Sequence, residues 1–147
     1  MSEESDQRAA VIAEAMTWLG TPFRNNAAVK GQGVDCAQLL AKVFANAGVV
    51  PPQNVEIYSP QFFLHHSEEK FLSYVLPLAR EIAIGDAREA DVVVYKIGRV
   101  FAHGAIVLEW PKAILHAHLL SGRVLITGAF EGDLFGRDVR AFSFWGR

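Results

Sequence analysis

The chain contains little cysteine: Cys36 is the only one among 147 residues. One cysteine cannot close a disulfide within the chain, so the fold needs no oxidising compartment to assemble. The chain also lacks a basic cluster. Its formal net charge is −2 and its lysines and arginines are scattered, which argues against a nucleic-acid partner. With 51% hydrophobic and 20% charged residues, the composition is that of an ordinary globular domain.

A long uninterrupted apolar run is also missing. The longest apolar region, "VFAHGAIVLEWPKAILHAHLL" (100–120), is broken by charged residues, a proline and three histidines, so we expect paired strands and no membrane insertion. The start "MSEESDQRAA" is acidic and resembles neither a secretory signal nor a transit peptide. We therefore expect cytoplasmic synthesis without a signal peptide. With no repeat, linker or low-complexity tract, the sequence predicts one domain over 1–147.

Two helices are predicted in the first third of the chain. Apolar residues recur three and four positions apart over 5–20, with Ser5 as a candidate N-cap. A loop is expected over 25–34. A second helix follows, with Asp35 as N-cap, Cys36 in the first turn and Gly48 at the end. Short helical pieces are expected near 60–75, after a serine-proline pair.

Strands dominate the second half. Five segments are rich in β-branched and aromatic residues and are separated by turn signals. These are "ADVVVYKI" (90–97), "FAHGAIVL" (101–108), "KAILHAHL" (112–119), "RVLITGAF" (123–130) and "VRAFSFW" (139–145). Helices first and strands afterwards indicate the α+β class, with the N-terminal helices packed on an antiparallel sheet of about five strands.

Cys36 is the first candidate for chemistry. A thiol at a helix start lies beside unpaired backbone N–H groups and the positive end of the helix dipole, and both lower the pKa of a cysteine. The same N–H groups can stabilise an oxyanion if the sulfur attacks a carbonyl. Such a nucleophile needs a base, usually a histidine that a third polar group orients. The competing interpretation is an inert cysteine in the core.

Two imidazoles can meet on consecutive strands. The five histidines are His65, His66, His103, His116 and His118. The first two lie in a polar stretch that we interpret as solvated surface. A hairpin between the next two strands brings His103 opposite His116 or His118, and spacing does not choose between them. The histidines and the thiol could instead bind zinc, although the short-spaced ligand pairs typical of zinc sites are absent.

Four segments, in order, resemble the NlpC/P60 cysteine peptidases over nearly the whole chain. They are "WLGTPF" (18–23), "GVDCAQLL" (33–40), "FAHGAIVLE" (101–109) and "AILHAHLLSGRVLI" (113–126). The resemblance implies a papain-like NlpC/P60 fold. It also implies an endopeptidase without metal or other cofactor, which hydrolyses an amide bond in the stem peptides of bacterial peptidoglycan. In this family the bond often joins D-glutamate to diaminopimelate.

The resemblance assigns roles to individual residues. Cys36 would be the nucleophile and His103 the general base. His116, which precedes an alanine as in the family pattern, would hold the His103 ring in its productive orientation. The residues expected to bind substrate are Phe23, Asn25 and Asp35.

A finer resemblance is to the phage-tail branch of the family, which includes gene transfer agents. It rests on "WLGTPFRNNAAVKGQGVDC" (18–36) and "IYSPQ" (57–61). It implies a virion component at the tail tip or baseplate that contacts other tail proteins and acts at the bacterial cell wall. Three aromatic residues near the C-terminus are candidates for that contact, or else for core strand positions: Phe142, Phe144 and Trp145.

The sequence departs from the family pattern in three places. Phe23 replaces the usual tyrosine, whose hydroxyl can bond near the attacked carbonyl. Ala37-Gln38 replaces the common Ser-Gly, and Ala90-Asp91 replaces Gly-Asp before the first long strand. The Phe23 change motivates an alternative function, a structural tail or baseplate protein that keeps the peptidase fold with weak or lost activity.

Overall fold

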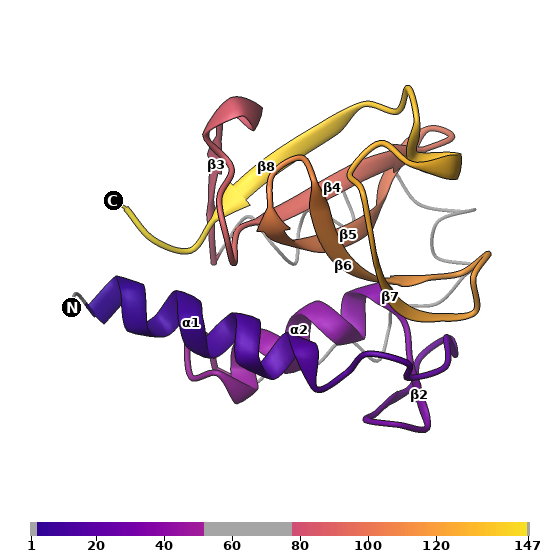
Figure 1. The fold of residues 1–147 in the computed structure, drawn as a ribbon, viewed down its shortest axis with the longest axis horizontal. Helices are drawn as coiled ribbons and strands as arrows, with labels where there is room; N and C mark the ends of the chain where they lie inside the picture. The colour runs from indigo at the N-terminus through magenta and orange to yellow at the C-terminus, as the bar shows by residue number, and fades with distance from the viewer. Residues whose placement is uncertain (1–2, 52–77, 147) are drawn as a thin grey trace.

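In the part of the chain that the structure describes, two helices cover one face of an antiparallel sheet. A computed structural model of the chain describes residues 3–51 and 78–146. In it, α1 (Glu3–Met16) and α2 (Cys36–Asn46) lie side by side below the strands (Figure 1). The predicted α+β class is confirmed. The helical pieces expected near 60–75, and with them His65 and His66, lie outside the described residues.

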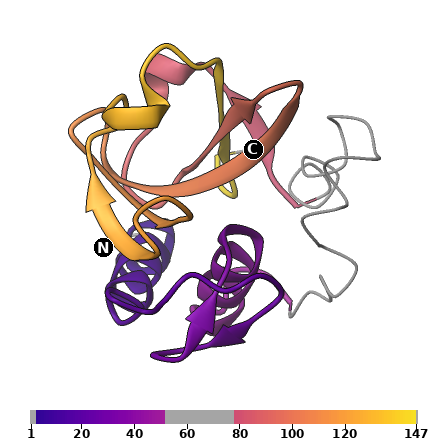
Figure 2. The ribbon, with the colours of Figure 1, turned by 90° about the vertical axis from the view of Figure 1, so that its right-hand side faces the viewer.

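Within the described residues the main sheet has six strands, all paired antiparallel in the order β3-β8-β4-β5-β6-β7. It curves over the helices (Figure 2). The five predicted strands correspond to β4 (Val92–Ile97), β5 (Val100–Glu109), β6 (Ala113–His118), β7 (Arg123–Thr127) and β8 (Val139–Ser143). Some strands were not predicted. They are the edge strand β3 (Arg80–Ile82), and a small hairpin of β1 (Ala28–Val29) and β2 (Gly33–Val34) inside the expected loop.

The central strands of the sheet are buried on both faces. One face packs on the helices through side chains such as Val94, Ile106 and Leu115. The opposite face has its own cluster, which includes Tyr95 and Ile114. A strand buried on both sides needs apolar residues at successive positions, which accounts for the continuous apolar start of β4.

The start of α2 is fixed as predicted. Asp35 has extended backbone angles (φ −105°, ψ 178°), and its carboxylate accepts a hydrogen bond from the Gln38 N–H at 2.8 Å. Gly48 follows the helix with φ +79°, a conformation that glycine adopts without steric cost. The apolar stripe of the helix packs against the sheet through Leu39, Leu40, Val43 and Phe44. Cys36, the first helical residue, is thereby held against the strands.

The predicted N-cap of the first helix is wrong, because α1 begins at Glu3 and Ser5 lies inside it. Acidic side chains at Glu3, Glu4 and Asp6 stabilise the positive end of the helix dipole, which favours the earlier start.

A buried ion pair joins α1 to the start of β4. Arg8 Nη1 lies 2.9 Å from Asp91 Oδ1, and the two side chains are only 5% and 1% exposed. The guanidinium also lies 4.3 Å from the ring centroid of Trp145. The neighbouring Ala90 has φ +73°. This is the left-handed region that glycine prefers, at the position where the family pattern has glycine.

The aromatic residues near the C-terminus belong to the core. Phe142 is fully buried and Trp145 is 8% exposed, so their interpretation as surface contacts is wrong. Phe144 is partly buried, with its ring centroid 4.5 Å from that of Phe44. The alternation of β8 turns Phe142 toward the helices, where a large apolar side chain is stabilised by removal from water.

Candidate active site

The thiol lies where the helix layer meets the sheet. Cys36 is 6% exposed, and its Sγ–H donates to the backbone carbonyl of Ala102 at 3.5 Å. Ala102 directly precedes His103 in β5. This contact therefore holds the sulfur beside the strand that carries the candidate base.

The structure places His103 beside His116. His103 Nε2 lies 2.8 Å from His116 Nδ1. On the far side of its ring, His116 Nε2 lies 2.9 Å from the hydroxyl of Thr127, which also contacts the Gly128 carbonyl at 3.0 Å. The chain of contacts crosses β5, β6 and β7, three neighbouring strands. His116 is 1% exposed, so the ring that links His103 to Thr127 is buried.

The strand register accounts for the ambiguity between the two histidines of β6. Ile106 pairs with Leu115, so a continued ladder puts His103 across from His118 and diagonal to His116. Both are within reach of a long side chain. The hydrogen bond goes to His116, with ring centroids 5.0 Å apart, while the His118 ring lies at 6.2 Å.

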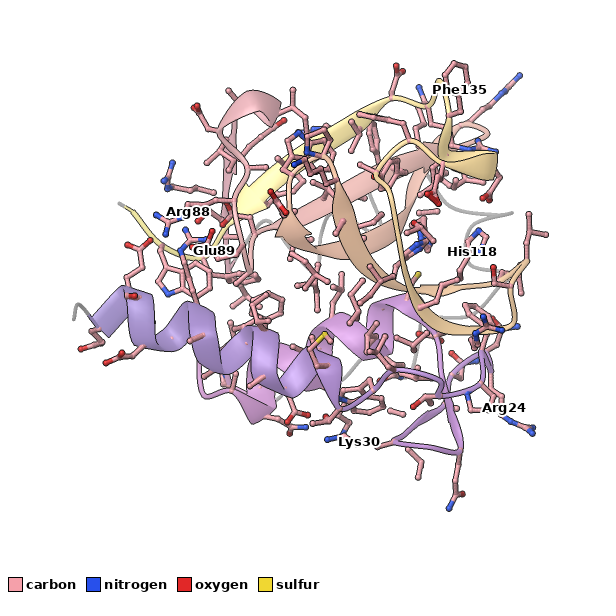
Figure 3. All side chains as sticks on the ribbon, in the orientation of Figure 1. Arg24, Lys30, Arg88, Glu89, His118 and Phe135 are labelled. Atoms are coloured by element: carbon pink, nitrogen blue, oxygen red, sulfur yellow. The ribbon has the colours of Figure 1, made fainter. Side chains whose placement is uncertain are left out.

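His118 has different partners. Its Nε2 lies 2.7 Å from Asp133 Oδ1, and its Nδ1 lies 2.7 Å from the Ser121 hydroxyl. Asp133 comes from the short 3-10 turn Gly132–Leu134 that precedes β8. In Figure 3, His118 lies at the same end of the molecule as Arg24, away from the start of α1. The hydrogen bonds to Asp133 and Ser121 hold His118 at the rim of the site.

The imidazoles of His103 and His116 are both neutral near pH 7. Burial, together with smaller contributions from the neighbouring His118 and Arg137 side chains, lowers the pKa of His103 to about 3. Burial likewise lowers the pKa of His116 to about 3, with His103 and His118 adding to the effect and Asp133 opposing it. A neutral His103 has a nitrogen lone pair and can act as a base.

Cys36 and His103 open onto the same cleft of about 710 Å³. All three residues expected to bind substrate, Phe23, Asn25 and Asp35, also line it. The Asp35 carboxylate, however, is 1% exposed and is engaged by the backbone N–H groups of Gln38 at 2.8 Å and Asn26 at 2.6 Å. Burial raises the pKa of Asp35, and these hydrogen bonds oppose the rise. These hydrogen bonds to the backbone indicate that Asp35 holds the shape of the cleft wall.

Much of the cleft wall is apolar. The remaining lining residues come from the β4–β5 hairpin, the β6–β7 hairpin and the segment before β8. They are Ile97, Gly98, Arg99, Val100, Ala102, His118, Leu119, Leu120, Asp133 and Arg137. Leu119 and Leu120 are 64% and 75% exposed. An apolar wall with a few polar groups is typical of a site that binds an organic ligand.

Nothing in the sequence indicated that Thr127, Asp133 and Arg137 belong to the site. Threonine is common in strands, so Thr127 carried no signal of its own. Asp133 and Arg137 lie in irregular chain before β8, where no periodicity predicts which side chains turn inward.

Within residues 3–51 and 78–146, no group of three or more histidine, cysteine, aspartate or glutamate side chains is arranged to hold a metal ion. The three histidines and the thiol are not arranged as such a group in this part of the chain. In the same part of the chain, no helix combines the length and apolarity that crossing a membrane requires.

No family model matches the sequence, and no curated protein matches it. Solved structures do. The peptidoglycan hydrolase RipB from Mycobacterium tuberculosis is similar over 100% of this chain and 70% of its own, with a TM-score of 0.66 at 17% identity. The P60 domain of antigen MAP1204 from Mycobacterium avium subspecies paratuberculosis gives a TM-score of 0.66 at 18% identity, over 97% and 98% of the two chains.

A third similar structure is RipD from Mycobacterium tuberculosis, with a TM-score of 0.60 at 16% identity over 95% of this chain and 98% of its own. It is described as a non-catalytic NlpC/p60 domain protein adapted to peptidoglycan binding. The predicted NlpC/P60 fold is confirmed by these matches, and the fold is shared by catalytic and non-catalytic proteins.

Proposed function

We propose that this protein is a cysteine peptidase that hydrolyses an amide bond in the stem peptides of bacterial peptidoglycan. The observation that carries the proposal is the shared cleft of Cys36 and His103, with His116 hydrogen-bonded behind His103 at 2.8 Å. The fold agrees with it, since RipB has this fold and is described as a peptidoglycan hydrolase.

The proposed reaction follows from the positions of these groups. His103 takes the proton of the Cys36 thiol, and the sulfur attacks the carbonyl carbon of the peptide. The oxyanion is stabilised at the start of α2 by backbone N–H groups at Cys36. The C–N bond then breaks, the amine leaves with the proton from His103, and a thioester remains. Water, deprotonated by His103, hydrolyses the thioester and restores the thiol.

Purified protein with isolated peptidoglycan or soluble stem peptides tests this function. Release of new amino groups should require both Cys36 and His103, because neither group alone can complete the cycle. Cys36→Ala should abolish the release while the melting temperature stays close to that of the wild type. Full hydrolysis by a folded Cys36→Ala protein would refute the assignment of the nucleophile.

We further propose that the enzyme is mounted on a phage-tail-like particle, at the tail tip or baseplate, next to other tail proteins. The support is the sequence resemblance over 18–36 and 57–61. The protein would be made in the cytoplasm of the producing cell and would reach the wall of the next cell on the particle. Mass spectrometry of purified particles tests the location, and absence of the protein from them would contradict it.

The second candidate function is a structural tail protein without significant activity. Phe23 in the position of the family tyrosine favours it, as does RipD, which has the same fold and is described as non-catalytic. Particles that carry Cys36→Ala distinguish the two functions. Particles that assemble but cannot open the wall support the enzyme, whereas particles with full infectivity support the structural protein.

A further inference from the structure

Thr127 ends the hydrogen-bond chain that starts at His103. Its Oγ1 lies 2.9 Å from His116 Nε2 and 3.0 Å from the backbone carbonyl of Gly128. A hydroxyl has one proton to donate, and a carbonyl oxygen can only accept. The Thr127 hydroxyl therefore donates to Gly128, and its oxygen is left as an acceptor for His116.

Because Thr127 donates to Gly128, the protonated nitrogen is determined in both imidazole rings. Since Thr127 accepts, His116 Nε2 carries the proton. A neutral imidazole has one N–H only, so His116 Nδ1 is an acceptor and His103 Nε2 must donate to it across 2.8 Å. The remaining nitrogen of His103, Nδ1, then holds the lone pair that a base needs. Each link in this chain fixes the tautomer of the next ring.

We propose that Thr127 is a positioning residue that sets the tautomers of His116 and His103, so that His103 presents an unprotonated Nδ1 for the thiol of Cys36. The proposal rests on the proposed function for its catalytic consequence. Thr127 itself lies outside the residues that line the cleft, so it acts only through the two rings.

Loss of the Thr127 hydroxyl reverses the preferred tautomers of His116 and His103. His116 is 1% exposed, so an N–H at Nε2 without an acceptor is a buried unsatisfied donor, which is costly. The ring avoids this cost by moving its proton to Nδ1, where it points at His103 Nε2. His103 must then accept at Nε2 and hold its own proton at Nδ1, the nitrogen that should receive the proton from Cys36. The base is present but in the wrong tautomer.

Thr127→Val tests the proposal, because valine keeps the shape of threonine and removes the hydroxyl. With a soluble stem peptide, kcat should fall about 10- to 100-fold, part of what a general base contributes, with KM unchanged. Thr127→Ser should restore most of the rate. Thr17→Val is the matched control, since Thr17 also donates its hydroxyl to a backbone carbonyl, that of Glu14, in an exposed turn after α1. It should leave kcat unchanged.

Nitrogen-15 NMR of the histidine rings gives a readout that needs no activity. At pH 7 the wild type should show protonated Nε2 on both His103 and His116, and Thr127→Val should shift His116 toward protonated Nδ1. Protonated Nδ1 on His116 in the wild type would overturn the proposal without any variant, as would a Thr127→Val protein with unchanged kcat. Expected tautomers in a wild type that cleaves no peptide would refute the proposed function and leave the tautomer assignment standing.

Discussion

Acid should destabilise the fold through His116. Burial of this ring, which is 1% exposed, lowers its pKa from 6.5 to about 3. His116 therefore binds a proton near pH 6.5 in the unfolded chain, but only near pH 3 in the folded protein. A pKa lowered by folding gives stability that is complete above pH 6.5 and is lost as pH falls toward 3. At pH 5, 1.5 units below 6.5, one unit being about 1.36 kcal/mol, the loss is about 2 kcal/mol relative to pH 7.

Urea unfolding followed by tryptophan fluorescence measures this loss. His116→Gln is the comparison, because glutamine cannot titrate, whereas His103 is present in both proteins. The wild type should be the more stable protein at pH 7, since the variant loses the fitted ring and its hydrogen bonds. The difference in unfolding free energy should shrink by about 2 kcal/mol at pH 5. A difference that stays the same between pH 7 and pH 5 would refute the reasoning that His116 is held neutral.

Three further predictions concern the buried ion pair, Phe23 and the thiol of Cys36. Arg8→Met should cost about 3–5 kcal/mol of unfolding free energy, because it leaves the Asp91 carboxylate buried without its partner. Arg88→Met, which breaks an exposed pair, should cost less than about 1 kcal/mol in the same urea titration; equal costs would contradict the ion-pair argument. Phe23→Tyr should raise kcat, by up to about 10²–10³ if the new hydroxyl reaches the oxyanion, and an unchanged kcat would show that it does not. Alkylation of Cys36 should titrate well below the ordinary cysteine pKa of about 8.5; a midpoint at 8.5 or no reaction would count against an activated thiol.

Local signals predicted much of the fold. Asp35, followed by an apolar stripe, correctly predicted the start of α2. This was possible because an N-cap and the buried face of a helix are both encoded within a few neighbouring residues. The strands of the second half carried β-branched runs that both faces of the sheet require. The edge strand β3 has only three residues, Arg80–Ile82, too few to show a pattern. Its pairing with β8 depends on a segment more than fifty residues away.

The site could be predicted only in part. Period-two alternation puts His116 and His118 on one face of β6, so spacing allowed both as partners of His103. What separates them comes from elsewhere in the chain: Thr127 on β7 accepts from His116, and Asp133 in the turn before β8 binds His118. Neither partner has a local sequence signal, because each is defined by the direction of a side chain in a folded sheet.

The two halves of the proposed catalytic site are built by different layers. The histidine chain spans three hydrogen-bonded strands, and none of its hydrogen bonds from His103 to Gly128 involves a residue of α2. The position of Cys36 is set by α2, of which it is the first residue. Asp35 joins this helix to the loop that lines the cleft, because one of its carboxylate oxygens accepts from the Gln38 N–H and the other from the Asn26 N–H. The distance between sulfur and base is therefore set by how α2 packs on β5 and β6. Changes in that packing should act on thiol reactivity while the tautomers of the two rings stay as they are.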